Sequence, residues 1–350
     1  MIKYLGSKKR LVPVLGEMFS RSGASTALDM FTGTTRVAQD WKRRGGIVTA
    51  VDLARYSKVF ADCWIATDRD SVSQDDLADA LLHLNSLPGE AGYFTDTFCV
   101  RSRFFQTHNG ERIDAIRNVI ESDYGDSPLY PVLLTSLILA ADKVDSTTGV
   151  QMAYVKSWAK RSFNDLELRD PGLIPGEGFA VHGDALEVAP SLGHVDIAYL
   201  DPPYNQHRYF ANYHIWETLV AWDQPEHYGV ACKRIDVRDD STKSRFNEKR
   251  NMPTAFRNLI SSLQADTIVL SYNDESWIDR DELIDMCAAH QEVRFLEFPS
   301  KRYVGAQIGV FDPRGNKVGA VSHLHNHEWI VVAGDRTTVS RMTDDLPVTA

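Results

Sequence analysis

A strand, a glycine-containing turn, a helix and a second strand follow one another within about 25 residues near the start of the chain. This segment runs from Thr26 to Asp52 and reads TALDM, FTGTT, RVAQDWKRR, GG and IVTAVD. The β-branched residues of IVTAVD are typical of a short buried strand, and Gly45-Gly46 is a natural stop for the preceding helix. Such a unit places its strands parallel in one sheet, which restricts the chain to an α/β fold.

The rest of the chain divides into a helical stretch and a second group of strands. SQDDLADALLHLNSL, ERIDAIRNVIES and PVLLTSLILAADKV show helical periodicity with no β-branched runs between them. Strand patterns resume at FAVHGDA, VDIAYLD, TIVLSY, EVRFLEF and EWIVVAG. We therefore expect one discontinuous α/β domain at residues 1–65 and 166–340, a helical insertion at 66–165 and a polar tail at 341–350.

The composition excludes several classes of protein. Hydrophobic residues make up 43% and charged residues 25% of the 350 residues, which is globular and not disordered composition. No stretch approaches the roughly 20 apolar residues of a membrane helix, and the N-terminus lacks the features of a signal peptide. The widely spaced cysteines Cys63, Cys99, Cys232 and Cys287 form no CxxC pair. They indicate reduced thiols in a cytoplasmic protein.

The charge leaves the question of a nucleic-acid partner open. A formal net charge of −10 argues mildly against one, but a local positive track is sufficient for DNA binding. The segment from Cys232 to Arg250 is such a candidate, although many charge runs are only solvated loops. Its basic residues, set against four acids, are Lys233, Arg234, Arg238, Lys243, Arg245, Lys249 and Arg250.

The most informative short motif is Asp201-Pro202-Pro203-Tyr204, which directly follows the apolar strand VDIAYL. Two prolines stiffen the backbone and remove N–H donors, so the nearby carbonyls point where the loop dictates. In open α/β sheets, ligands bind beyond the carboxyl ends of the strands, where this tetrad belongs. We interpret it as part of a functional site and not as a rigid surface turn.

Two other strand ends carry candidate ligand-binding residues. Gly33, in the turn FTGTT, lets the backbone approach a ligand closely. Asp52 follows it by 19 residues at the end of the next strand, where an acid that hydrogen-bonds a ribose hydroxyl is expected. Asp184 follows the strand FAVH. Taken alone, both acids are equally well explained as turn caps.

Together these segments resemble the Dam-like D12 class of N6-adenine-specific DNA methyltransferases. Asp201–Tyr204 matches the family's catalytic tetrad, and Asp29–Thr35 is similar to its cofactor loop D-x-F-x-G-x-G, with Thr35 where a second glycine is usual. KYLGSKKR resembles its N-terminal cofactor segment. The resemblance continues, in the family's order over more than half of the chain, through RFFQTHNGERIDAIR, LILAADKVDSTTGVQMAYVKSW, YNQHRYFANYHIWETL, LSYNDESWI and SKRYVG.

The resemblance implies a Rossmann-like methyltransferase fold whose helical insertion recognises the target. The protein would transfer the methyl group of S-adenosylmethionine to adenine N6 in double-stranded DNA. Asp201 and the Pro202 carbonyl would accept hydrogen bonds from the amine, and Tyr204 would stack on the flipped-out base. The cofactor-binding residues would be Tyr4, Lys8, Asp29, Phe31, Gly33, Asp52, Asp184 and Asp201. We expect DNA phosphates at Arg234, Arg245, Lys249 and Arg250.

Several alternatives stay open at this stage. A motif of an acid or amide, two prolines and an aromatic residue also occurs in enzymes that methylate other amino groups. These are cytosine N4, RNA adenine and a protein glutamine. Thr35 gives some footing to a non-catalytic DNA-binding protein on the same scaffold. His323, His325 and His327 alternate and could present three imidazoles to a metal, but attack on a sulfonium needs none, so we predict no metal. The sequence does not reveal the recognition site, or whether a restriction endonuclease accompanies the protein.

Overall fold

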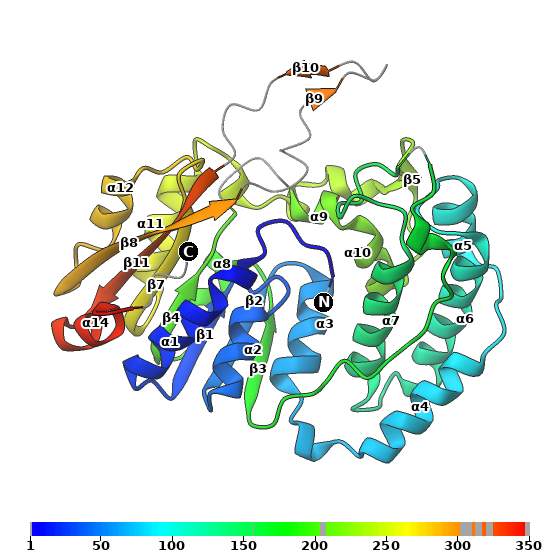
Figure 1. Ribbon diagram of the computed structural model, residues 1–350, viewed down its shortest axis with the longest axis horizontal. Helices are drawn as coiled ribbons and strands as arrows, with labels where there is room; N and C mark the ends of the chain where they lie inside the picture. Colours follow the sequence, from blue (N-terminus) through cyan, green and yellow to red (C-terminus); the bar gives the residue numbers. More distant parts are fainter. Residues whose placement is uncertain are drawn as a thin grey trace.

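The computed structural model describes residues 2–155, 157–203, 208–301, 310–311, 317–319 and 325–346. A seven-stranded sheet in the order β3-β2-β1-β4-β7-β11-β8 lies at its centre (Figure 1). Six strands are parallel, and β11 is antiparallel to its neighbours β7 and β8. The strands are β1 Thr26–Met30, β2 Ile47–Asp52, β3 Gly178–His182, β4 Val195–Leu200, β7 Ala265–Asn273, β8 Glu292–Lys301 and β11 His325–Gly334. The expected α/β fold is confirmed.

The central strands are buried on both faces, as the apolar runs predict. In β4, Ile197 and Tyr199 join one hydrophobic cluster, while Ala198 and Leu200 join the cluster on the opposite face. This division follows from the two-residue period of a strand. Parallel sheets of this kind require helices on both faces, and the chain supplies them.

Helices cover the two faces unequally. Four of them pack on the first face: α1 Val12–Ser22, α2 Arg36–Arg43, α3 Arg55–Ala61 and α14 Arg336–Thr343. The second face is covered by α8 Ala185–Val188, α11 Met252–Ser262 and α12 Arg280–Met286. The prediction of a polar tail from residue 341 is wrong, because α14 continues to Thr343 and the side chain of Met342 is fully buried against the core.

Within the stretch predicted as a helical insertion, the chain beyond α3 forms further helices (Figure 1). Its helices are α4 Gln74–Ser86, α5 Tyr93–Thr95, α6 Thr107–Tyr124 and α7 Tyr130–Val144. The structure adds a second segment to this layer, formed by α9 Tyr209–Asn212 and α10 His214–Ala221. The buried Arg117 side chain of α6 donates from Nε to the Leu219 carbonyl at 2.8 Å. One hydrophobic cluster therefore continues from the sheet into the helical layer.

The remaining elements are short. The strands β5 His227–Tyr228 and β6 Lys233–Arg234 form one hairpin, and β9 Val310–Phe311 and β10 Lys317–Gly319 form another. Three single-turn helices follow β6, namely η7 Ile235–Arg238, η8 Asp240–Thr242 and η9 Arg245–Asn247. No helix in the described part of the chain is long and apolar enough to cross a membrane.

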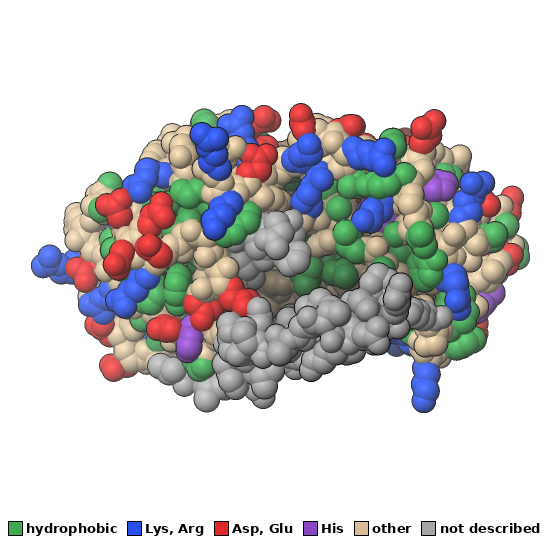
Figure 2. All heavy atoms as spheres, turned by 90° about the horizontal axis from the view of Figure 1, so that it is seen from above, with side chains coloured by type: hydrophobic (Ala, Val, Ile, Leu, Met, Phe, Trp, Pro, Cys, Tyr) green, Lys and Arg blue, Asp and Glu red, His purple; other side chains and the backbone are tan. Residues whose placement is uncertain are grey.

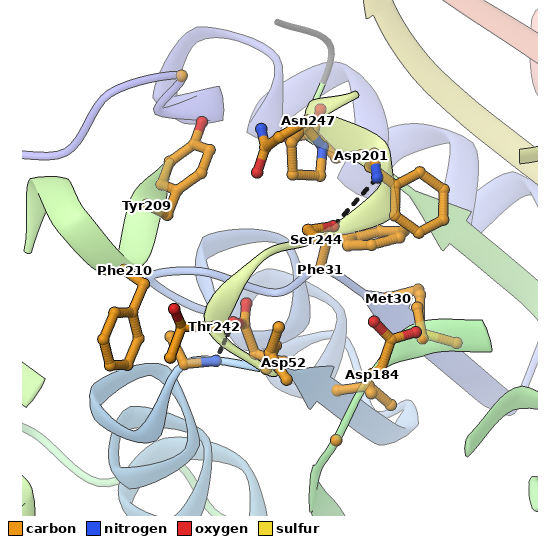
Figure 3. Close-up of a pocket in the computed structure, with 18 of the residues that line it drawn as sticks. Met30, Phe31, Asp52, Asp184, Asp201, Tyr209, Phe210, Thr242, Ser244 and Asn247 are labelled. Atoms are coloured by element: carbon orange, nitrogen blue, oxygen red, sulfur yellow. Dashed lines mark hydrogen bonds between the residues drawn. The ribbon is translucent and has the colours of Figure 1, made fainter. Parts of the chain in front are cut away.

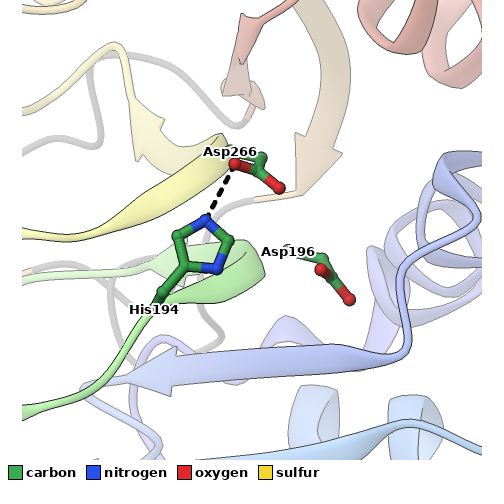
Figure 4. Close-up of side chains that lie close together, drawn as sticks. All are labelled: His194, Asp196 and Asp266. Carbon is green, nitrogen blue, oxygen red and sulfur yellow. Dashed lines mark hydrogen bonds and ion pairs between the residues drawn. The ribbon is translucent and has the colours of Figure 1, made fainter.

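A carboxylate fixes the entry into β1 at the amino ends of the strands. Oδ2 of Asp196 accepts hydrogen bonds from the backbone N–H groups of Thr26 and Ser25, both at 2.8 Å. These hydrogen bonds from backbone amides lower the pKa of Asp196 to about 2, and the bond from Thr26 has the largest effect. His194 and Asp266 lie beside it (Figure 4), and ligand atoms of the three lie within 4.8 Å of one another. Because Asp196 is already engaged by the backbone, we assign this group to holding the β1 entry.

Candidate functional site

A pocket opens at the carboxyl ends of β1, β2, β3 and β4, where an open α/β sheet binds its ligands. Figure 3 shows Asp52 and Asp184 on one side of it and Tyr209 and Asn247 on the other. The lining residues are Tyr4, Gly6, Met30, Phe31, Val51, Asp52, Leu53, Ala54, Gly183, Asp184, Ala185, Asp201, Pro203, Tyr209, Phe210, Thr242, Ser244, Phe246 and Asn247. The pocket therefore combines carboxylates with aromatic and aliphatic walls.

Asp52 is held in place by two backbone amides. Its Oδ2 accepts from the N–H of Gly33 and its Oδ1 from the N–H of Ala54, both at 2.8 Å. Burial raises the pKa of Asp52, and these two hydrogen bonds oppose the rise. Asp52 also lines the pocket, so its carboxylate is accessible to a ligand there. Asp52 thus has both functions weighed from the sequence, as a turn cap and as a pocket acid.

Asp184 combines the same two roles. It is the N-cap residue of α8, where its Oδ1 accepts from the Leu186 N–H at 2.9 Å. Its side chain also lines the pocket. The sequence allowed either a turn cap or a ligand-binding acid at this position. In the structure, one carboxylate caps the helix start and also lines the pocket.

Asp29 lies behind the pocket wall, and Thr35 adopts the conformation of the glycine it replaces. Oδ2 of Asp29 accepts from the Thr32 hydroxyl at 2.8 Å and from the Ala38 N–H at 3.1 Å, so Asp29 shapes the turn. Burial raises its pKa to about 7.

Thr35 has a φ of 58°, in the left-handed region that favours glycine. Its hydroxyl accepts from Nε2 of Gln39 at 2.8 Å, which supports the side chain in this position.

Lys8 connects the N-terminal segment to the end of β4. Its Nζ lies 3.1 Å from Oδ1 of Asp201 and 3.1 Å from Oε2 of Glu328 on β11. Burial raises the pKa of Asp201 to about 6, the Lys8 ammonium opposes the rise, and the Glu328 carboxylate adds to it. Perturbed carboxylates of this kind concentrate at functional sites. Lys8 thus favours the ionised form of Asp201, whose side chain is only 17% exposed.

Aromatic rings fix the N-terminal segment against the pocket. The ring of Tyr4 stacks on Tyr209 with 5.3 Å between centroids and on Tyr213 with 5.0 Å. Gly33 lies against the same ring: it has a φ of +52°, and a Cβ atom added there would lie 3.0 Å from Tyr4. The Tyr4 ring therefore connects the N-terminal segment with the turn that contains Gly33. Both segments are predicted from the sequence to bind the cofactor.

The last wall comes from the turns after β6. Thr242, Ser244 and Asn247 face the pocket (Figure 3). Phe246 is buried between them and packs edge-on against Phe31 with 4.9 Å between ring centroids. The segment that the sequence marked only as basic therefore forms part of the pocket itself.

Comparison with known proteins supplies the family. The model of the D12 class N6 adenine-specific DNA methyltransferases matches residues 4–286, which include every element of the site up to α12. The chain belongs to this family.

Named relatives agree with this assignment. Type II methyltransferase M.NlaIII of Neisseria lactamica is 31% identical over 290 residues, which cover 78% of this chain and 84% of that protein. Modification methylase StsI of Streptococcus sanguinis is 30% identical over 303 residues, covering 81% and 46%. Type II methyltransferase M.FokI of Planomicrobium okeanokoites is 27% identical over 327 residues, covering 86% and 50%. The chain spans about half the length of the last two.

The structure of this D12-class chain brings most of the predicted site residues together. Tyr4, Phe31, Asp52, Asp184 and Asp201 line the pocket. Asp29, Lys8 and Gly33 instead support those lining residues from behind, as described above. The buried Pro202 is followed by the lining residue Pro203. Tyr204 lies outside the described residues.

One predicted DNA contact is wrong. Arg234 is only 2% exposed, and its guanidinium donates to Asp223 at 2.7 and 2.8 Å and to Asp236 at 2.8 Å. Such a paired, buried guanidinium cannot reach a phosphate, so Arg234 holds β6 and η7 in place. Arg245, Lys249 and Arg250 are exposed.

The alternating histidines are only partly described. His323 and the side chain of His325 lie outside the described residues. Nδ1 of His327 lies 3.3 Å from Asp274 and 3.4 Å from Glu297. His327 thus lies beside two carboxylates, from neighbouring segments of the sheet.

Sequence reasoning missed much of the pocket wall. Six residues line the pocket but were not predicted as site residues: Tyr209, Phe210, Thr242, Ser244, Phe246 and Asn247. The basic segment held a usable signal in Phe246, an aromatic residue inside a charged stretch. An isolated aromatic residue in such a run indicates that one side of the segment is buried.

The contact between Gly33 and Tyr4 gives a testable consequence. Gly33→Ala adds the cost of a left-handed alanine, about 1–2 kcal/mol, and a clash with the Tyr4 ring, about 1–3 kcal/mol. Gly172→Ala is the matched control, because Gly172 also has a positive φ, +79°, but no atom within 4 Å of an added Cβ. Urea unfolding should show a larger loss of stability for Gly33→Ala. Equal losses would show that Tyr4 does not constrain this turn.

Proposed function

We propose that this chain transfers the methyl group of S-adenosylmethionine to the N6 amino group of adenine in DNA, within the cytoplasm. The observation that carries the proposal is Asp201, a partly buried carboxylate on the pocket wall that is paired with Lys8 at 3.1 Å. It occupies the first position of the Asp-Pro-Pro-Tyr tetrad in a chain of the D12 class. Free, buried cysteines are consistent with a reducing compartment.

The pocket residues suit the parts of S-adenosylmethionine. Asp52 offers two correctly held acceptor oxygens to a ribose, in the manner of strand-end acids in related folds. Phe31 and Phe246 offer apolar surface to a flat base, and Asp184 offers an acceptor at the adjoining edge. Bound there, S-adenosylmethionine supplies an electrophilic methyl group on a sulfonium.

Asp201 addresses the weakness of the other reactant. The exocyclic amine of adenine is a poor nucleophile, because its lone pair is delocalised into the ring. The Asp201 carboxylate and the Pro202 carbonyl accept hydrogen bonds from the two amino hydrogens, which favours a tetrahedral nitrogen with its lone pair free to attack. An ionised acceptor also stabilises the positive charge that develops on nitrogen. Lys8 supports this role, since it favours the ionised form of Asp201.

The target base must leave the double helix to reach this pocket. We assign Tyr204 to stacking on the extruded base, a contact worth about 1–3 kcal/mol. The names of the relatives, which are type II methyltransferases and modification methylases, support a restriction endonuclease as a further functional partner. Adenine is favoured over cytosine N4, RNA and protein glutamine by the match to the N6 adenine class.

The product of the reaction tests the proposal. Duplex DNA incubated with the protein and S-adenosylmethionine carrying a deuterated methyl group is digested to nucleosides and analysed by mass spectrometry. We expect the label in N6-methyladenine, with none in N4-methylcytosine. Labelled cytosine would assign the chain to the rival substrate. Absence of label, with intact binding of the cofactor and DNA, would favour a non-catalytic DNA-binding protein.

We infer that DNA lies across the end of the sheet that holds the pocket. Figure 2 looks onto this end and shows Lys and Arg side chains along one side of a central hollow, interspersed with acidic ones. Arg245, Lys249 and Arg250 are exposed on the segment whose inner side lines the pocket. Their position would bring phosphates to the rim while the extruded base enters the pocket.

Salt dependence tests this surface. Each lost phosphate contact should flatten the slope of log affinity against log salt by about 0.9. We expect the triple variant Arg245→Gln, Lys249→Gln, Arg250→Gln to flatten the slope and to leave S-adenosylmethionine affinity unchanged. The control triple Arg69→Gln, Arg169→Gln, Arg336→Gln removes the same charge from exposed residues that do not line the pocket, and should leave the slope unchanged. Equal slopes in both triples would place the DNA elsewhere.

A further inference from the structure

Another buried carboxylate, Glu217 of α10, takes no part in the proposed chemistry. Its side chain is fully buried, and burial raises its pKa to about 7. A buried ionisable group is costly unless specific partners compensate for the loss of water. The contacts of Glu217 therefore indicate why the fold keeps an acid at this position.

The partner of Glu217 is the start of α3. Its Oε1 accepts a hydrogen bond from the backbone N–H of Arg55 at 2.9 Å, across 162 residues of sequence. The first N–H groups of a helix have no partner within the helix. The N-cap residue, Ala54, offers no side-chain acceptor. Glu217 supplies the missing acceptor from another part of the chain.

This helix start is joined directly to the pocket. Asp52, Leu53 and Ala54 immediately precede Arg55, and all three line the pocket. The Ala54 N–H also donates to Oδ1 of Asp52 at 2.8 Å. The contact at Arg55 is therefore three residues from the acid that we assign to the ribose.

The residue one helical turn before Glu217 holds the other cofactor segment. The Tyr213 hydroxyl accepts from the Leu5 N–H at 2.7 Å, and its ring stacks on Tyr4 with 5.0 Å between centroids. Residues 213–217 thus contact both the N-terminal segment and the loop after β2. Neither of these two segments is near residues 213–217 in sequence.

We propose that Glu217 is a positioning residue for the cofactor: it holds the loop Asp52–Ala54 in the conformation that binds S-adenosylmethionine. The inference rests on the proposed function, because it requires the pocket to be the cofactor site. Glu217 touches no reactant and acts through the Arg55 amide and the loop before it. Loss of Glu217 should therefore weaken cofactor binding more than it slows the methyl transfer of the bound complex.

Three substitutions of Glu217 separate the effect of the acceptor's distance from the Arg55 N–H from the effect of its charge. Glu217→Gln keeps an oxygen within reach of the Arg55 N–H and removes the charge. Glu217→Asp keeps the charge and withdraws it by one methylene, and Glu217→Ala removes both. We expect Glu217→Gln to stay within about threefold of the wild type in S-adenosylmethionine affinity. Glu217→Asp and Glu217→Ala should lose at least about tenfold, which corresponds to about 1.4 kcal/mol.

The measurements are calorimetric titration with S-adenosylmethionine and the split between KM for S-adenosylmethionine and kcat. KM should rise in the Asp and Ala variants while kcat at saturating cofactor stays within about threefold. Leu219→Val, a trimmed core residue on the same helix, is the control for general loss of stability and should leave KM unchanged. Should Glu217→Ala fail to fold, the comparison of Asp with Gln still decides the matter.

Two results would overturn the inference. One is wild-type affinity in a folded Glu217→Asp variant, and the other is a fall in kcat without a change in KM. If the wild-type protein itself does not bind S-adenosylmethionine, the proposed function fails first and the inference fails with it. The wild-type titration therefore distinguishes the two failures.

Discussion

Burial of carboxylates at the carboxyl ends of adjacent parallel strands is the constraint on which the rest of this structure depends. Asp29 is the penultimate residue of β1, Asp52 ends β2 and Asp201 follows β4, and these three strands are neighbours in the sheet. Asp29 is fully buried, and Asp52 and Asp201 are partly buried. A buried carboxylate must be compensated by hydrogen bonds or an opposite charge. Each acid meets this need differently: Asp29 through a hydroxyl and an amide, Asp52 through two amides, and Asp201 through Lys8.

These compensating contacts draw distant segments of the chain to one place. Lys8 brings the N-terminal segment to β4, and Gly33 and Ala54 bring two loops to Asp52. Glu217 extends the same principle into the helical layer. The pocket is therefore assembled from donors that lie far apart in sequence. The protonation of these acids therefore depends on their partners within the protein more than on bulk water.

Local sequence patterns were sufficient to predict the strands, and Asp52 and Asp201 at the carboxyl ends of two of them. β1, α2 and β2 lie where the periodicity and the glycine pair placed them, because each element is defined by neighbouring residues. The contacts between distant segments could not be predicted in this way. The sequence alone does not distinguish an exposed arginine, such as Arg245, from one that is enclosed by two carboxylates, such as Arg234. Phe246, Tyr209 and Glu217 acquire their roles only when the chain returns to the pocket, and Met342 is buried only because α14 packs against α1.

The central claim is that the ionised Asp201 carboxylate lowers the barrier to methyl transfer. Asp201→Asn tests it most directly, because it preserves size and one carbonyl acceptor while it removes the charge. A hydrogen bond to a charged group is worth about 1.5–3 kcal/mol, against about 1 kcal/mol for a neutral pair, and this difference should appear mainly in the transition state. The measurement is the single-turnover rate of adenine N6 methylation at saturating S-adenosylmethionine and DNA. We predict a fall of at least about tenfold, at about 1.4 kcal/mol per decade, with DNA affinity unchanged. A variant that methylates adenine at the wild-type rate would contradict the account.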